Sequence, residues 1–164
     1  MRFPSPSPET TREAARLLAF AVDARGLVVS LVGPLGAGKT VFVKGLAEGL
    51  GIDPAVVTSP TFVIASEYPM RPGRRLAHVD LYRVESREEL ELAGFADLIG
   101  PGAVVAVEWG DRFPEALPPD RLEISIRRPD FERDPARRVL DALCYGAVSE
   151  AALTNWRAAL AARF

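Results

Sequence analysis

The 164-residue sequence contains no glutamine, one asparagine, one cysteine, one histidine and two lysines. The single cysteine, Cys144, excludes an intramolecular disulfide and a cysteine-based metal cluster, and we expect it to be a core thiol in a reducing compartment. The lone His78 excludes a metal site with several histidine ligands. No stretch approaches the ~18 consecutive apolar residues of a membrane span, and the N-terminal residues show no secretory signal. We therefore expect a cytoplasmic protein without a membrane segment.

Composition sets the size and class of the fold. Apolar residues make up 48% of the chain and charged residues 26%, as in ordinary globular proteins. The length suits one domain, residues 1–164, with a proper hydrophobic core. The net charge is −2, so the surface as a whole is not built to wrap nucleic acid.

The most informative stretch is GPLGAGKT at positions 33–40. It fits the phosphate-binding pattern of a glycine, four residues and then Gly-Lys-Thr. The β-branched run 27–32 before it predicts a buried strand, and Val43, Leu46 and Leu50 after it recur at helical spacing. Strand, glycine loop and helix are the context that the motif requires. A glycine-rich turn with a chance Gly-Lys-Thr is the alternative, which this context disfavours.

Each residue type in this loop has a chemical reason. Gly33, Gly36 and Gly38 allow the backbone to turn tightly and approach a polyphosphate closely. The loop N–H groups and the start of the helix then face the anion. Lys39 would reach the terminal phosphates, and the Thr40 hydroxyl would hold Mg²⁺. Of the 20 basic residues only Lys39 and one other are lysines, so a chain that favours arginine keeps lysine here.

Two acidic residues end apolar strands. Glu108 follows the run 103–107, and Asp80 follows the weaker run 76–79. Both are candidates for the acid beside a magnesium ion that a phosphate-binding loop requires. The alternative for each is a strand-end carboxylate that contacts solvent or caps a helix.

The missing Asn-Lys-x-Asp element and the missing glutamine bear on the identity of the nucleotide and of the catalytic base. Guanine specificity usually needs an Asn-Lys-x-Asp element, but no lysine follows the single asparagine, Asn155. ATP is therefore favoured over GTP. Without any glutamine a water-positioning Gln is excluded, so the catalytic base is Asp80 or Glu108.

The rest of the chain predicts an alternation of helices and strands, completing a three-layer α/β P-loop NTPase-like fold. Its sheet should be mostly parallel with added antiparallel strands. A rigid Ser-Pro lead-in precedes a helix that starts at Ser7, and Ser86 and Glu89 form a capping box. The expected elements are helices from 8 to 22, after the loop, from 86 to 99 and over 149–164, and strands at 27–32, 62–68, 76–82, 103–107, 122–126 and 138–144.

Several motifs resemble one bacterial family. Besides the loop, the sequence has SPTF at 59–62, HVDLYR at 78–83 and EW at 108–109. Their order and spacing closely resemble the TsaE (YjeE) family over about residues 7–126. Pro34 departs from that pattern, which commonly has Asp there, and the last forty residues carry no matching motif.

The resemblance implies a small ATPase of tRNA threonylcarbamoyladenosine (t6A) modification. TsaD-like and TsaB-like proteins would be its partners, and tRNA would be contacted at most indirectly. ATP and Mg²⁺ would be the cofactors, with Asp80 at the reacting phosphate and Thr61 in a switch-like loop. The expected catalytic residues are Lys39, Asp80 and Glu108, the metal ligands are Thr40, Glu108 and Asp80, and the nucleotide contacts are Thr11, Gly33, Gly36, Ala37, Gly38, Lys39, Thr40, Thr61 and Trp109.

Some alternatives stay open. A small-molecule kinase would share the loop and acids but usually has an arginine-bearing lid, which is not visible here. A non-hydrolytic ATP-dependent binding module would share the loop as well. Trp109 could cover the nucleotide or a partner surface, or be a core aromatic. Arg83 could act on phosphate or form a surface ion pair. Arginines near 71–75 and 127–133 are expected to be solvated surface.

Overall fold

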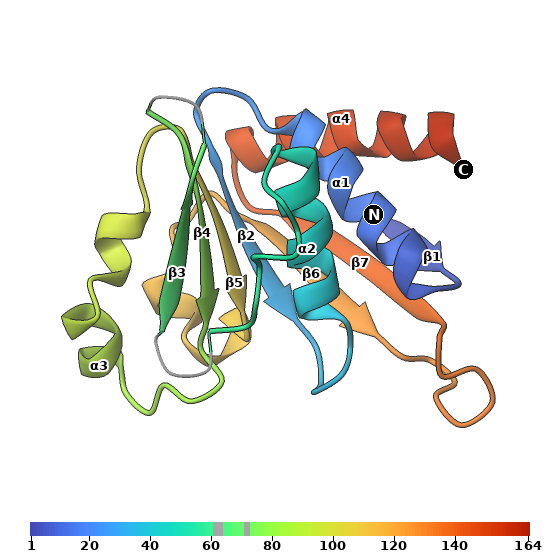
Figure 1. Cartoon of the computed structure of the whole chain (residues 1–164), viewed down its shortest axis with the longest axis horizontal. Coiled ribbons are helices and arrows are strands. Elements are labelled where there is room, and N and C mark those ends of the chain that lie inside the picture. Colours follow the sequence, from blue (N-terminus) through green and yellow to red (C-terminus); the bar gives the residue numbers. More distant parts are fainter. Residues whose placement is uncertain (61–63, 71–72) are drawn as a thin grey trace.

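The structure is a computed structural model that describes residues 1–60, 64–70 and 73–164. Within these residues, a mixed sheet of seven strands forms the centre of the molecule (Figure 1). The elements in chain order are β1 (Arg2–Ser5), α1 (Pro8–Ala21), β2 (Leu27–Val32), α2 (Lys39–Gly49), β3 (Ala65–Pro69), β4 (Arg75–Asp80), α3 (Arg87–Leu92), β5 (Ala103–Glu108), β6 (Leu122–Arg127), β7 (Arg138–Cys144) and α4 (Ala147–Arg163). Short 3-10 helices, η1 (Phe95–Leu98), η2 (Gly110–Arg112) and η3 (Pro114–Ala116), lie in the connections.

The strand order is β1-β7-β6-β2-β5-β4-β3. The four central strands β6, β2, β5 and β4 are parallel to one another. The edges are antiparallel, with β3 paired to β4 on one side and β7 and β1 following β6 on the other. The predicted sheet, mostly parallel with added antiparallel strands, is confirmed.

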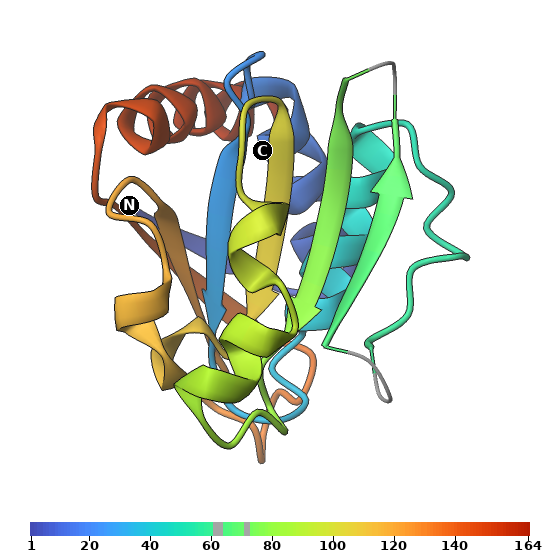
Figure 2. The same cartoon turned by 90° about the vertical axis from the view of Figure 1, so that its left-hand side faces the viewer.

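Helices cover both faces of the sheet. Alternate residues of β2 show why: Val29 and Leu31 pack in the core under α1, α2 and α4, whereas Val28 packs in the core under α3 and η1. Figure 2 shows α3 and η1 on one side of the sheet and α2 on the other. This apolar alternation on both faces produces the predicted three layers.

The contact between α1 and α2 fixes the helix that follows the glycine loop. A Cβ on Gly45 would lie 2.1 Å from the Arg12 carbonyl oxygen, and one on Gly49 would lie 2.4 Å from that of Arg16. Only glycine allows the two backbones to come this close. On α4, Trp156 is fully buried and its indole N–H donates a hydrogen bond to the Ala14 carbonyl of α1 at 2.7 Å.

Several local predictions are confirmed. Ser7 caps α1 by accepting a hydrogen bond from the Thr10 N–H, with Pro8 in the first turn. The strands predicted at 62–68 and 76–82 appear as the antiparallel pair β3 and β4, although residues 62 and 63 lie outside the described residues. Ser86 caps α3, and Glu89 reaches back as expected but accepts from the Glu85 N–H.

Two predictions are wrong. The helix expected to run to residue 99 ends at Leu92, because Gly94 turns the chain with φ 73°. Leu92 in the last turn of α3 is 90% exposed, while Phe95 and Leu98 are buried from the following 3-10 helix. The lead-in before α1 contains an additional edge strand, β1, paired with β7.

The structure also describes the single cysteine and the apolar character of the helices. Cys144 is a free thiol, as expected, but it is only partly buried at the end of β7. Among the helices of the described part of the chain, none has the length and apolar character needed to cross a membrane.

Candidate active site

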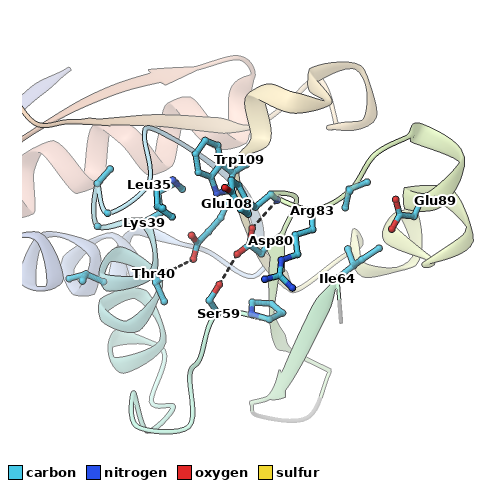
Figure 3. Close-up of a pocket in the computed structure, with 17 residues that line it drawn as sticks. Leu35, Lys39, Thr40, Ser59, Ile64, Asp80, Arg83, Glu89, Glu108 and Trp109 are labelled. Carbon is cyan, nitrogen blue, oxygen red and sulfur yellow. Dashed lines mark hydrogen bonds between the residues drawn. The ribbon is translucent and has the colours of Figure 1, made fainter. Parts of the chain in front are cut away.

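A cleft of about 630 Å³ opens at the carboxyl ends of β2, β4 and β5 (Figure 3). This edge is where ligands bind in open α/β sheets. Its walls come from the glycine loop, the segment before β3, the ends of β4 and β5, and the chain that leads to α3. The lining residues are Leu35, Gly36, Ala37, Gly38, Lys39, Thr40, Val41, Ser59, Pro60, Ile64, Asp80, Tyr82, Arg83, Val84, Glu89, Glu108 and Trp109.

Lys39 is the first residue of α2 and lies almost entirely out of solvent, at 5% exposure. Its Nζ donates to the carbonyls of Gly33 at 2.6 Å and Pro34 at 3.1 Å. The same atom lies 3.7 Å from the centroid of the Trp109 ring. Burial lowers the pKa of Lys39, and the negative charge of Glu108 is the largest contribution opposing it. The ammonium therefore sits in a poorly hydrated place, where an anion is a better partner than a carbonyl.

Glu108 ends β5 and is held by two hydrogen bonds to the same oxygen. The Thr40 hydroxyl donates to Oε1 at 2.7 Å, and Nε2 of the fully buried His78 lies 2.9 Å from it. Nδ1 of His78 has no partner among the described residues, which assigns the ring proton to Nε2. Because both contacts use Oε1, the Oε2 oxygen remains for a further ligand.

Asp80 ends β4 opposite Glu108 in the parallel register. The Ser59 hydroxyl donates to Oδ2 at 2.6 Å, and the Tyr82 N–H donates to Oδ1 at 3.0 Å. Figure 3 shows the Asp80 and Glu108 carboxylates on the same side of the cleft, facing Thr40 and Ser59. Each carboxylate is thus oriented by a hydroxyl from another segment.

Trp109 follows Glu108 with φ 61°, the single positive φ of a non-glycine residue in the described ranges. Such a conformation costs about 1–3 kcal/mol and tends to occur at functional sites. The backbone N–H of Trp109 donates to the Leu31 carbonyl at 2.9 Å, and the Trp109 ring contacts the Tyr82 ring at 5.1 Å between centroids. Trp109 therefore lines the cleft and also packs against the core on the α3 side of the sheet, and its contact with a nucleotide stays a prediction.

Most of the predicted site residues come together. Those that line the cleft are Gly36, Ala37, Gly38, Lys39, Thr40, Asp80, Glu108 and Trp109. Gly33 lies at the base of the loop, where its carbonyl accepts from Lys39. Thr11 does not line the cleft: it is buried in the first turn of α1 and its hydroxyl lies 2.7 Å from that of Ser5. Thr61 lies outside the described residues.

Three contacts at the site were not predicted. His78 and Ser59 orient the two acids, and Arg138 donates to the glycine loop from β7. His78 and Ser59 belong to the motifs that carry the family resemblance, but the resemblance assigned neither residue a role. Nothing in the sequence near Arg138 connects it with a loop about a hundred residues earlier.

The chemistry of the donors suits a nucleotide with a divalent cation. Within 1–60, 64–70 and 73–164, no three His, Cys, Asp or Glu side chains gather into a metal site. Mg²⁺ in nucleotide sites takes only one or two protein ligands and completes its shell with water and phosphate oxygens. The adjacent Thr40 hydroxyl and Glu108 carboxylate fit that requirement.

Comparisons with known proteins agree with one another. The family model described as "Threonylcarbamoyl adenosine biosynthesis protein TsaE" matches residues 5–139. The chain is 45% identical over 131 residues to the tRNA threonylcarbamoyladenosine biosynthesis protein TsaE of Bacillus subtilis, covering 78% of each chain. The TsaE protein of Streptomyces coelicolor is 46% identical over 122 residues, covering 71% of this chain and 78% of that protein. A crystal structure of Bacillus subtilis YdiB superimposes with a TM-score of 0.71 and 34% identity, covering 96% of this chain and 94% of that one.

Proposed function

The chain belongs to the TsaE family, and on that premise we propose that it binds ATP with Mg²⁺ in the cleft and hydrolyses it in t6A modification of tRNA. The observation that carries this proposal is the arrangement at the carboxyl ends of β2 and β5. There Lys39 and the glycine loop lie beside the Thr40–Glu108 pair.

Binding would begin at the phosphates. The loop N–H groups and the start of α2 form an anion site, with the helix dipole behind it. Lys39 would exchange its two carbonyl acceptors for phosphate oxygens, a gain because the acceptor as well as the donor would then be charged. Trp109 and Tyr82 offer an aromatic surface next to the phosphate site.

Thr40, Glu108 and Asp80 are the residues that would hold Mg²⁺. The ion would neutralise charge that develops on the phosphate oxygens. The hydrogen bond from His78 keeps Oε1 of Glu108 in place, so the free Oε2 points to a defined position.

Asp80 is the residue we assign to the reaction itself. Its carboxylate is oriented at both oxygens by Ser59 and Tyr82, so it can accept a hydrogen bond from a water at the terminal phosphate. The chain has no glutamine to perform this role. Lys39 would stabilise the charge of the transferred group.

The relatives are named for t6A biosynthesis, and we propose the same process for this chain. TsaD-like and TsaB-like proteins would be its partners, tRNA would be contacted at most indirectly, and the protein would act in the cytoplasm. Hydrolysis would be slow in the isolated chain and faster in the assembly.

Equilibrium binding and turnover with the purified chain test the proposal. ATP should bind more tightly than GTP, Mg²⁺ should strengthen binding, and phosphate should be released slowly. Binding without any turnover, alone or with partners, would support a non-hydrolytic binding module instead. ATP consumption that requires a small-molecule acceptor would support a kinase.

A further inference from the structure

The phosphate-binding loop is in contact with an arginine from the last forty residues. Arg138, the first residue of β7, donates from Nε to the Ala37 carbonyl at 2.7 Å. A terminal nitrogen of the same guanidinium lies 3.4 Å from the Gly36 carbonyl. Further bonds to the carbonyls of Pro135 and Arg137 fix the guanidinium in the hairpin between β6 and β7.

These contacts constrain the direction of loop N–H groups. The C=O and N–H of a trans peptide point to opposite sides. The Ala37 carbonyl belongs to the same peptide as the Gly38 N–H, so holding the carbonyl toward Arg138 directs that N–H away from it. Gly38 has φ 109°, a conformation with no local preference to fix its orientation. Backbone hydrogen bonds hold the Ala37 N–H and the Gly38 carbonyl, and Arg138 holds the carbonyl of the peptide between these two residues.

The Arg138 guanidinium forms no close ion pair among the described residues, although the negative charge of Asp134 acts on it from a greater distance. None of the ion pairs between described residues includes Arg138. Burial lowers its pKa, and the neighbouring Arg128 contributes in the same direction. A guanidinium nitrogen of Arg128 also lies 3.3 Å from the place that a Cβ on Gly36 would occupy. Two like charges beside one loop are unfavourable alone and favourable next to a polyanion.

We propose that Arg138 is a positioning residue of the phosphate-binding loop, which fixes the Gly36 and Ala37 carbonyls so that the loop N–H groups face a polyphosphate before it arrives. This inference rests on the proposed nucleotide site. The guanidinium has a second effect besides orientation. A charged donor on the Ala37 carbonyl polarises that peptide and strengthens the Gly38 N–H as a hydrogen-bond donor. The hairpin between β6 and β7, whose arginines had been expected to be solvated surface, is thereby part of the site.

The test compares Arg138→Ala and Arg138→Lys with the control Arg127→Ala. Arg127 lies on the same hairpin but pairs with Asp141, so its removal changes the net charge equally without touching the loop. Calorimetry would measure the affinity for tripolyphosphate, which reports on the phosphate cradle alone, and for ATP. Thermal unfolding without ligand would report on the fold.

We expect Arg138→Ala to weaken tripolyphosphate and ATP binding at least tenfold, about 1.4 kcal/mol. The loss should persist at ~1 M salt, where the Debye length is about 3 Å, because positioning is not screened as a distant charge is. Arg138→Lys should lose most of the affinity too, since an ammonium has three N–H donors and no planar fork, and cannot reproduce the contacts of the guanidinium with four separate carbonyls. Arg127→Ala should lose less than threefold, and that loss should vanish at high salt.

Three results would overturn the inference. Arg138→Ala could bind tripolyphosphate like Arg127→Ala, or Arg138→Lys could bind like the unchanged protein, which would show that charge alone acts. Arg138→Ala could also melt earlier with unchanged affinity, which would assign the arginine to the fold only. If the unchanged protein binds neither ligand, the proposed nucleotide site itself fails, a different result from these three.

Discussion

Lys39 shows at the scale of single residues how the cleft is prepared for an anion. The ammonium is buried against the Trp109 ring, and its Nζ is satisfied by two loop carbonyls. Burial lowers its pKa, which means that the fold disfavours the charged form. A polyphosphate would relieve that penalty, so the residue serves binding more than folding.

Replacing Lys39 therefore separates its role in nucleotide binding from its role in folding. In Lys39→Ala, affinity for Mg-ATP should fall by about 10- to 150-fold, because a charge-assisted hydrogen bond contributes about 1.5–3 kcal/mol. The free energy of unfolding should change by less than about 1 kcal/mol, since two lost hydrogen bonds are offset by the removed buried charge. Calorimetry and denaturant unfolding measure both, and a folded variant with undiminished affinity would contradict the site.

The two acids should differ in what their removal does. Glu108→Ala should weaken the dependence of ATP binding on Mg²⁺, because Oε1 is held at Thr40 and Oε2 is the oxygen left for the ion. Asp80→Ala keeps Thr40 and Glu108 as ligands of the ion, so it should bind Mg-ATP within about threefold of the unchanged protein. It should turn ATP over at least 100-fold more slowly, the usual scale for general acid–base catalysis. Titrations with and without Mg²⁺ and single-turnover assays separate these effects. Normal hydrolysis by Asp80→Ala in the assembled complex would rule out its role.

The sequence predicted these residues unequally well. Lys39, Thr40 and the loop glycines are contiguous, so the motif alone places them. Asp80 and Glu108 were found because each ends an apolar strand, and parallel strands bring their carboxyl ends together. His78, Ser59 and Arg138 depend on distances between separate segments, which no local pattern contains.

At the scale of elements, an ion-pair network ties α1 to α4. Glu13 on α1 accepts from Arg16 at 2.7 Å and from Arg163 on α4 at 3.0 Å. The hydrogen bond from Arg16 is the main reason that the pKa of Glu13 falls from 4.5 to about 2. The Glu13 side chain is 21% exposed and that of Arg163 is 62% exposed. Solvent therefore screens the network and limits its contribution to folding stability.

This network should produce a pH-dependent contribution to stability. Because the pKa of Glu13 is lower in the folded state, its contribution is full above about pH 4.5 and declines as the pH falls toward 2. Glu13→Gln should cost about 0.5–1 kcal/mol at pH 7 and less at pH 3. Denaturant unfolding at both pH values measures the difference, with Glu48→Gln as a control for a more exposed pair. An equal deficit at pH 3 and pH 7 would contradict the assignment.

Elements were predictable where the local signals agreed. The β-branched run of β5 and the Ser7–Pro8 start of α1 combine pattern and cap, and both elements appear as expected. The helix after Ser86 was extended too far because Phe95 continued the apolar spacing across Gly94. The strand β1 was missed because its pairing with β7 is a long-range contact that its proline-rich sequence does not suggest.

At the scale of the whole molecule, the cleft draws its lining from separate segments between residues 35 and 109, and Arg138 supports it from β7. The loop after β2, the segment before β3 and the ends of β4 and β5 form its walls, and the hairpin before β7 supports the loop. The described contacts hold both acids and the lysine, but the chain has no glutamine to place a water. This arrangement supports our proposal of an ATPase that its partners activate.

Steady-state ATP turnover with and without partners tests the central claim most directly. A positioned water and an arginine finger supplied by a partner can contribute about 10³–10⁵ in rate. The isolated chain should therefore turn over slowly, and TsaD-like and TsaB-like proteins together should raise its rate at least tenfold above their own background. Asp80→Ala in the same mixture should abolish the increase. An isolated chain that already hydrolyses ATP as fast as the mixture, or a mixture equally active with Asp80→Ala, would contradict the account.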